Sequence, residues 1–80
     1  MNSMNVVYSS PHYYVAEYPV ENRFELINLH QGTGTFLRGE VAASFRRSLA
    51  TVIAGSPTVE TVDEFLERFD GLMTQPAVLH

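Results

Sequence analysis

The chain has 80 residues, no cysteine and a formal net charge of −4 at pH 7. This length predicts one domain over residues 1–80, and the lack of cysteine excludes disulfides and thiolate metal ligands. The negative charge disfavours duplex DNA and acidic membranes as partners, because both attract positively charged proteins.

The amino-terminal residues show no targeting signal. Met1-Asn2-Ser3-Met4 carries no basic stretch, and no long apolar stretch follows it, so we expect no signal peptide. The apolar runs of the chain are much shorter than the roughly 18 residues that span a bilayer. We therefore expect a cytoplasmic protein that has no membrane partner.

The first part of the chain has the composition of β-strands. Residues 4–8 are β-branched and aromatic, and Ser9-Ser10-Pro11 is typical of a turn. Residues 12–18 form a second predicted strand, which Pro19 ends. Neither face of this second strand is clearly polar, so we predict that it lies centrally in a sheet and is largely covered.

Two more strands are predicted before the pattern changes. They cover residues 24–30 and 35–38, and the glycine-containing segment 31–34 between them suits a hairpin. Short connections can join only antiparallel neighbours, since parallel pairing needs a long crossover. The four strands should therefore form an antiparallel meander.

Two amphipathic helices are predicted to follow the strands. A helical stripe in the first consists of Val41, Phe45, Leu49, Val52 and Ile53, and Gly55 is placed to end it. The second should begin near Thr58 or Thr61, where Thr61 to Glu64 fits a capping box, and should end near Gly71. The predicted fold class is α+β, with both helices packed on one face of the sheet.

Motifs for catalysis or metal binding are weak. The segment 31–35 resembles a phosphate-binding loop, but it lacks the Gly-Lys-Ser/Thr element and does not open directly into a helix, which favours a turn. His12, His30 and His80 are far apart in the sequence, so no metal or cofactor is predicted. No serine lies in a nucleophile motif, and we expect a protein that is not an enzyme.

The carboxyl-terminal tail is the clearest candidate interaction surface. Chain ends are usually polar, whereas this one is apolar, which indicates that it packs either on its own sheet or on a second copy. We therefore predict a homodimer or a complex with another protein. The candidate interaction residues are Met73, Gln75, Val78, Leu79, His80, Arg46 and Arg47.

An alternative is a small nucleic-acid-binding regulator. Arg38, Arg46 and Arg47 lie within ten residues of each other and could hold phosphates. Tyrosines of residues 4–18 could stack on single-stranded bases, but those strands contain no positive charge. This makes nucleic acid the less favoured partner.

Two segments resemble a known family. Val6 to Pro19 reads VVYSSPHYYVAEYP, and the end of the chain includes VDEFL and, from Asp70, DGLMTQPAVLH. These segments resemble small uncharacterised proteins from beta-proteobacteria that are catalogued as a domain of unknown function. The resemblance implies a bacterial, cytoplasmic protein, and it carries over no activity and no catalytic residue.

Overall fold

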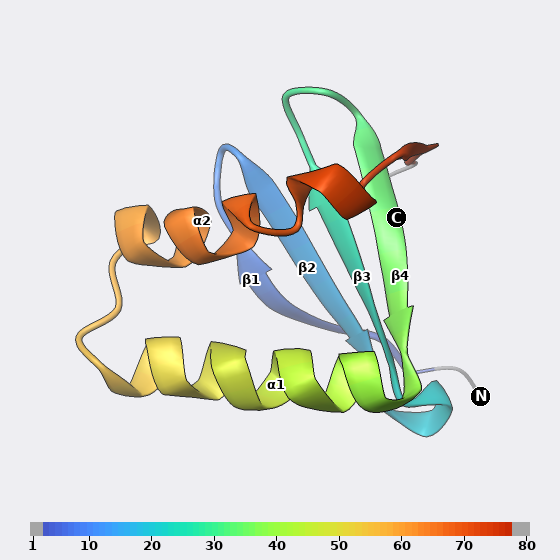
Figure 1. Ribbon diagram of the computed structural model, residues 1–80, viewed down its shortest axis with the longest axis horizontal. Coiled ribbons are helices and arrows are strands. Elements are labelled where there is room, and N and C mark those ends of the chain that lie inside the picture. The colour runs from blue at the N-terminus through green and yellow to red at the C-terminus, as the bar shows by residue number, and fades with distance from the viewer. Residues whose placement is uncertain (1–2, 78–80) are drawn as a thin grey trace.

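A computed structural model of the chain describes residues 3–77. Four strands are followed by two helices and a short fifth strand (Figure 1). The elements are β1 (Asn5–Ser9), β2 (Tyr13–Tyr18), the 3-10 turn η1 (Pro19–Glu21), β3 (Arg23–Asn28), β4 (Thr33–Arg38), α1 (Gly39–Ala54), α2 (Val59–Glu67), the 3-10 turn η2 (Asp70–Leu72) and β5 (Gln75–Pro76).

The strands form one antiparallel sheet in the order β1-β2-β3-β4-β5. The predicted meander is confirmed, and β2 lies inside the sheet between β1 and β3. The fifth strand is an addition to the four that the sequence predicts. Both helices lie on the same side of the sheet (Figure 1), which confirms the α+β fold class. The described helices include none that is long and apolar enough to cross a bilayer.

The core lies between the sheet and the two helices. Alternate residues of a strand point to the same face, and the buried cluster takes such alternate residues from β2 and β3 together with one residue of β4. Phe45 of α1 is at the centre, with its ring centroid 5.0 Å from that of Phe24, 5.7 Å from Phe65 and 5.2 Å from Phe69. The other buried members of this cluster are Tyr13, Val15, Leu26, Leu37, Ala42, Leu49, Val62, Leu66 and Met73.

The predicted stripe of α1 is only partly correct. Phe45 and Leu49 are buried, but Val41 is 55% exposed and Ile53 is 45% exposed. Ala42 is fully buried in place of Val41. The reason is the rotation of the helix, which begins directly after β4 at Gly39 and thereby brings Ala42 to the sheet.

The second helix begins at the first of the two predicted positions. Thr58 is the residue that caps α2, because its hydroxyl accepts from the Thr61 amide while the Thr61 hydroxyl accepts from the Thr58 amide. The capping box predicted from Thr61 to Glu64 is therefore wrong by three residues. The helix ends at Glu67, and η2 occupies the turn that was predicted to belong to its last residues.

Candidate functional site

The outer edge of β4 is paired over only part of its length. In the described part of the chain, β5 pairs with Thr33 and Gly34 and does not reach the rest of β4. The Ala77 amide donates to the Gly32 carbonyl at 3.0 Å, which shows that backbone groups of Gly32 point outward. Because these directions alternate along an antiparallel strand, the amide and carbonyl of Phe36 and the amide of Arg38 also point outward. The Arg38 carbonyl belongs to the N-cap residue of α1 and accepts the first hydrogen bond of that helix.

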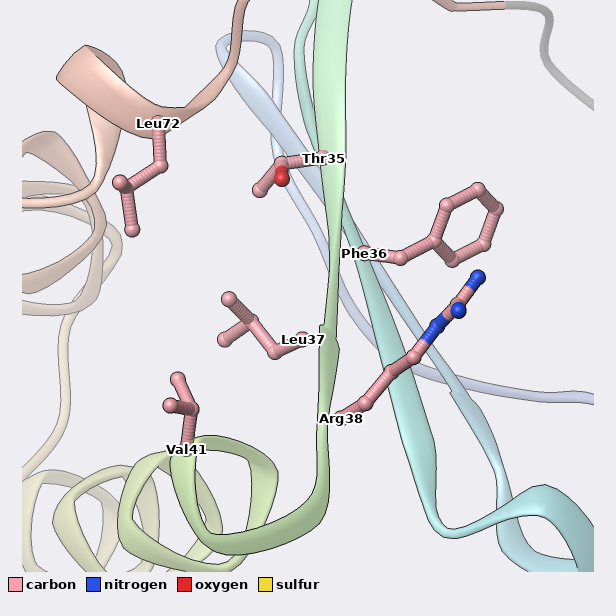
Figure 2. Close-up of a pocket in the computed structure, with 6 residues that line it drawn as sticks. All are labelled: Thr35, Phe36, Leu37, Arg38, Val41 and Leu72. Atoms are coloured by element: carbon pink, nitrogen blue, oxygen red, sulfur yellow. The ribbon is translucent and has the colours of Figure 1, made fainter.

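A groove runs along this unpaired edge. It has a volume of about 460 Å³ and is lined by Thr35, Phe36, Leu37, Arg38, Val41 and Leu72. Figure 2 shows the side chains of Leu37, Val41 and Leu72 on the helix side of β4, and those of Phe36 and Arg38 on the opposite side. The edge therefore lies between an apolar surface on the helix side and the Phe36 ring with the Arg38 side chain on the other side (Figure 2).

Three of the lining residues are large, apolar and well exposed. Phe36 is 43% exposed, Val41 is 55% exposed and Leu72 is 52% exposed. Singly exposed apolar residues are common, but these three line the same edge as the outward backbone groups. An apolar rim beside unpaired amides is what a strand-binding site requires.

The groove forms where β4 ends at Arg38 and α1 begins at the next residue. Gly39 has a φ of +58°, a left-handed conformation that glycine adopts without steric cost, and α1 begins there. Val41 thus lies one helical turn from the end of β4, and η2 brings Leu72 to the other end of the groove (Figure 2). The sequence analysis did not identify Phe36, Val41 or Leu72 as residues of an exposed site. The adjacent bulky residues at 36 and 37 do indicate that one of these two side chains must lie away from the core.

The face of the sheet opposite the helices carries an aromatic and cationic cluster. The Arg23 guanidinium lies 4.6 Å from the ring centroid of Tyr18 and 4.6 Å from that of Phe36. The Tyr18 hydroxyl donates to the Glu25 carboxylate at 3.0 Å. Burial, followed by this bond to Glu25, raises the pKa of Tyr18. The Phe36 ring beside the free edge thus has the Arg23 guanidinium on one of its faces.

The tail docks on its own sheet as far as the structure describes it. Gln75 is exposed and belongs to β5, whose pairing with β4 is intramolecular. Met73 is 3% exposed and packs in the core, so it is not available to a partner. The predicted interaction residues Val78, Leu79 and His80 lie outside the described residues.

The three arginines of the nucleic-acid alternative do not act as one group. Arg46 binds Glu17, with a distance of 2.7 Å between its Nη2 and Glu17 Oε2, and its guanidinium lies 5.1 Å from the Phe24 ring centroid. Arg47 follows it on the exposed surface of α1, and Arg38 lies at the groove. Arg46 is thus already engaged in linking α1 to β2.

A second hollow of about 370 Å³ lies between the ends of β2 and β3 and helix α2. His12 and His30 stack there, with 4.6 Å between their ring centroids, and their Nδ1 and Nε2 atoms are in contact. The other lining residues are Tyr13, Glu60, Asp63 and Glu67. Within residues 3–77, no three or more His, Asp or Glu side chains are placed to hold a metal ion.

Tyrosine hydroxyls beside this hollow bind carboxylates of the helical layer. The Tyr8 hydroxyl donates to Asp63 and the Tyr13 hydroxyl donates to Asp70, each at 2.8 Å. Burial is the main cause that raises the pKa of both tyrosines, and the bonds to Asp63 and Asp70 add to it. These bonds connect β1 and β2 to the carboxyl-terminal half of the chain.

We expect stability to fall at alkaline pH because of these tyrosines. The unfolded chain loses its tyrosine protons near pH 10, whereas the folded chain keeps them to a higher pH, so unfolding becomes more favourable as pH rises above about 10. The sequence has no lysine, so few other side chains titrate there. Urea denaturation between about pH 8 and 11 should show the decline.

The variant Tyr13→Phe separates this effect from general alkaline damage. It removes the ionisable hydroxyl, and the free energy of unfolding should then decline less steeply with pH than in the unmodified protein. Equal slopes for the two proteins would show that Tyr13 does not cause the decline.

Comparisons with known proteins place the chain among uncharacterised proteins. A family described as "Protein of unknown function (DUF3567)" matches residues 4–80. The chain is similar to "Protein BTH_I0359" of Burkholderia thailandensis, with 39% identity over 85 residues, which cover 96% of this chain and 100% of the relative. No solved structure matches it.

Proposed function

We propose a function for this protein from the geometry of its β4 edge. The chain belongs to the DUF3567 family, and the description of that family assigns no activity. In this proposal the protein is a non-enzymatic protein-interaction domain that binds an extended segment as an additional strand beside β4. The observation that supports it is the edge of β4, which no strand of residues 3–77 pairs with beyond Gly34. There the outward backbone groups at Phe36 and Arg38 lie between an apolar helix-side surface and the Phe36 ring (Figure 2).

The two parts of this site have different roles in binding. The outward amide and carbonyl of Phe36 and the outward amide of Arg38 would form main-chain hydrogen bonds, which supply affinity for any extended segment. Alternate side chains of that segment would contact Phe36 on one face and the hollow between Val41 and Leu72 on the other. Apolar side chains at both positions are therefore favoured.

The opposite edge of the sheet is a poorer acceptor. The pairing of β1 with β2 shifts between Val6 and Tyr8, so this strand contains a bulge or similar irregularity. Bulges disrupt the regular spacing of backbone groups and protect edges from further pairing. The β4 edge shows no such shift from Thr33 to Arg38, which makes it the better site for strand addition.

The nucleic-acid alternative has less support. Its three arginines would have to act together, but Arg46 binds Glu17 on the helix side while Arg38 lies at the β4 edge. Recruiting Arg46 to a phosphate would break the bond to Glu17. We therefore prefer a polypeptide partner.

Selection from a displayed library of random peptides tests the proposal. Selected peptides should slow hydrogen exchange of the Phe36 and Arg38 amides, which can be followed by NMR of the isotopically labelled protein. Phe36→Pro removes one outward amide, and an edge strand tolerates proline there. We expect it to weaken binding about tenfold more than Phe36→Ala, which keeps the amide and removes the same ring.

The other edge supplies the matched control. Val6→Pro introduces proline on β1, at an exposed residue, and should leave peptide binding unchanged. Peptides that protect β1 or the helices instead, or equal binding by the Pro and Ala variants at Phe36, would overturn the proposal.

A further inference from the structure

The β4 edge has a geometry that fits a copy of itself. The outward residues on the unpaired segment are Phe36 and Arg38, with Leu37 between them pointing its backbone groups toward β3. Two antiparallel copies can pair so that Phe36 of each lies opposite Arg38 of the other, with Leu37 opposite Leu37 on the two-fold axis. In this register the Arg38 amide of each copy donates to the Phe36 carbonyl of the other, which gives two symmetric bonds of an antiparallel ladder.

We propose that the partner strand at this edge is β4 of a second copy, paired in this register. This inference rests on the proposed function and names the partner that the edge binds. The dimer is isologous, because each copy contributes the same surface. The register leaves β5 undisturbed, since it uses only Phe36, Leu37 and Arg38, whereas β5 pairs with Thr33 and Gly34.

The helix side of the groove is complementary under the same two-fold rotation. Figure 2 shows Leu72 level with Thr35 near one end of the free segment and Val41 near the other end. Reversal of the second strand therefore brings Leu72 of one copy toward Val41 of the other, at two symmetric places. Both residues are more than half exposed in the single chain, so the dimer would bury apolar surface at each of the two symmetric contacts between Leu72 and Val41.

The open side of the sheet is complementary as well. Phe36 and Arg38 are cross-strand neighbours in the proposed register, and a guanidinium beside an aromatic ring is attracted to its face. Arg23 already lies against the Phe36 ring within one chain, and the 43% exposure of Phe36 leaves ring surface for Arg38 of the second copy. The segment is short, so we expect a weak, concentration-dependent dimer of micromolar affinity.

Sedimentation equilibrium from about 1 μM to about 1 mM tests the dimer. The unmodified protein should shift from monomer to dimer over this range. Val41→Arg and Leu72→Asp, each alone, should weaken dimerisation at least about tenfold, because each places a charge opposite an apolar residue. Both positions are exposed, and circular dichroism checks that each variant folds.

A mixture of the two variants provides the decisive measurement. A heterodimer of the Val41→Arg chain with the Leu72→Asp chain has one opposite-charge contact across the interface and one unchanged Leu72–Val41 contact. Neither chain contains both charges, so no pair within one chain can produce the effect. The mixture should therefore dimerise more strongly than either variant alone.

Isotope-filtered NMR locates the axis independently. In a sample of mixed labelled and unlabelled chains, an NOE between the two Leu37 Hα atoms is expected, since they face each other in a non-hydrogen-bonded pair. The control Val6→Pro should leave the dimer intact.

The outcomes separate this inference from the proposed function. A protein that stays monomeric to about 1 mM, but binds selected peptides at Phe36, would overturn self-pairing and leave strand addition standing. A dimer that is insensitive to Val41→Arg, Leu72→Asp and their mixture would show an interface elsewhere and also overturn the inference. Loss of the dimer in a folded Val6→Pro protein would indicate an interface that includes β1, which contradicts the proposed register.

Discussion

Replacing Phe45 by alanine is expected to remove nearly all of the stability of the protein, so that about half of the molecules or more are unfolded at 25 °C. Phe45 is 2% exposed, and its ring contacts those of Phe24, Phe65 and Phe69, so it joins both helices to the sheet. Truncating a buried phenylalanine costs about 3–5 kcal/mol through lost burial and the cavity that remains. A core of this size supplies roughly the same amount, about 3–5 kcal/mol.

Circular dichroism during urea denaturation measures this loss. Val59→Ala is the control, because Val59 is apolar, 52% exposed and at the first position of α2, and its change should stay within about 0.5 kcal/mol. A Phe45→Ala protein that unfolds at nearly the same urea concentration as the unmodified protein would contradict the central place of this ring in the core.

Replacing Gly34 by alanine is expected to cost about 1–3 kcal/mol and to loosen β5. A Cβ at this position would lie 2.6 Å from the Leu26 carbonyl oxygen and 3.3 Å from the Ala77 Cβ. The first contact is with backbone of β3, which cannot rotate away, and the second is with the segment that follows β5. The strand must shift, and the pairing of Gly34 with Gln75 should weaken.

Hydrogen exchange at the Ala77 amide reports on this change directly, because that amide donates to the Gly32 carbonyl. It should exchange faster in Gly34→Ala, and thermal denaturation should give a lower Tm. Gly71→Ala is the matched control, since a Cβ there meets no atom within 4 Å. Equal Ala77 exchange in both variants would show that Gly34 does not govern the docking of β5.

Docking of β5 determines how much of β4 remains free. The strand covers Thr33 and Gly34 and is two residues long, so within residues 3–77 the segment from Phe36 to Arg38 keeps an open edge. If β5 detaches in Gly34→Ala, the free edge becomes longer and other registers of self-pairing become possible. The glycine thus contributes to the specificity of the proposed interface as well as to stability.

The sequence by itself determined the order and type of the main elements. Short turns joined the strands into an antiparallel meander, and the absence of a polar face on residues 12–18 placed that strand inside the sheet. The helical spacing of apolar residues such as Phe45 and Leu49 predicted the first helix, and the apolar residues around Phe65 predicted the second. Each of these features depends on local geometry, which neighbouring residues set.

The tertiary structure alone decided which surface became available. The position of Gly39 at the end of β4 sets the rotation of α1, so Ala42 enters the core while Val41, an equally good candidate by period, lines the groove. The docking of β5 on its own sheet likewise depends on the space beside Gly34, which a residue distant in the sequence fills. The candidate site arises where β4 extends beyond β5, and the length of that overlap depends on contacts between distant segments.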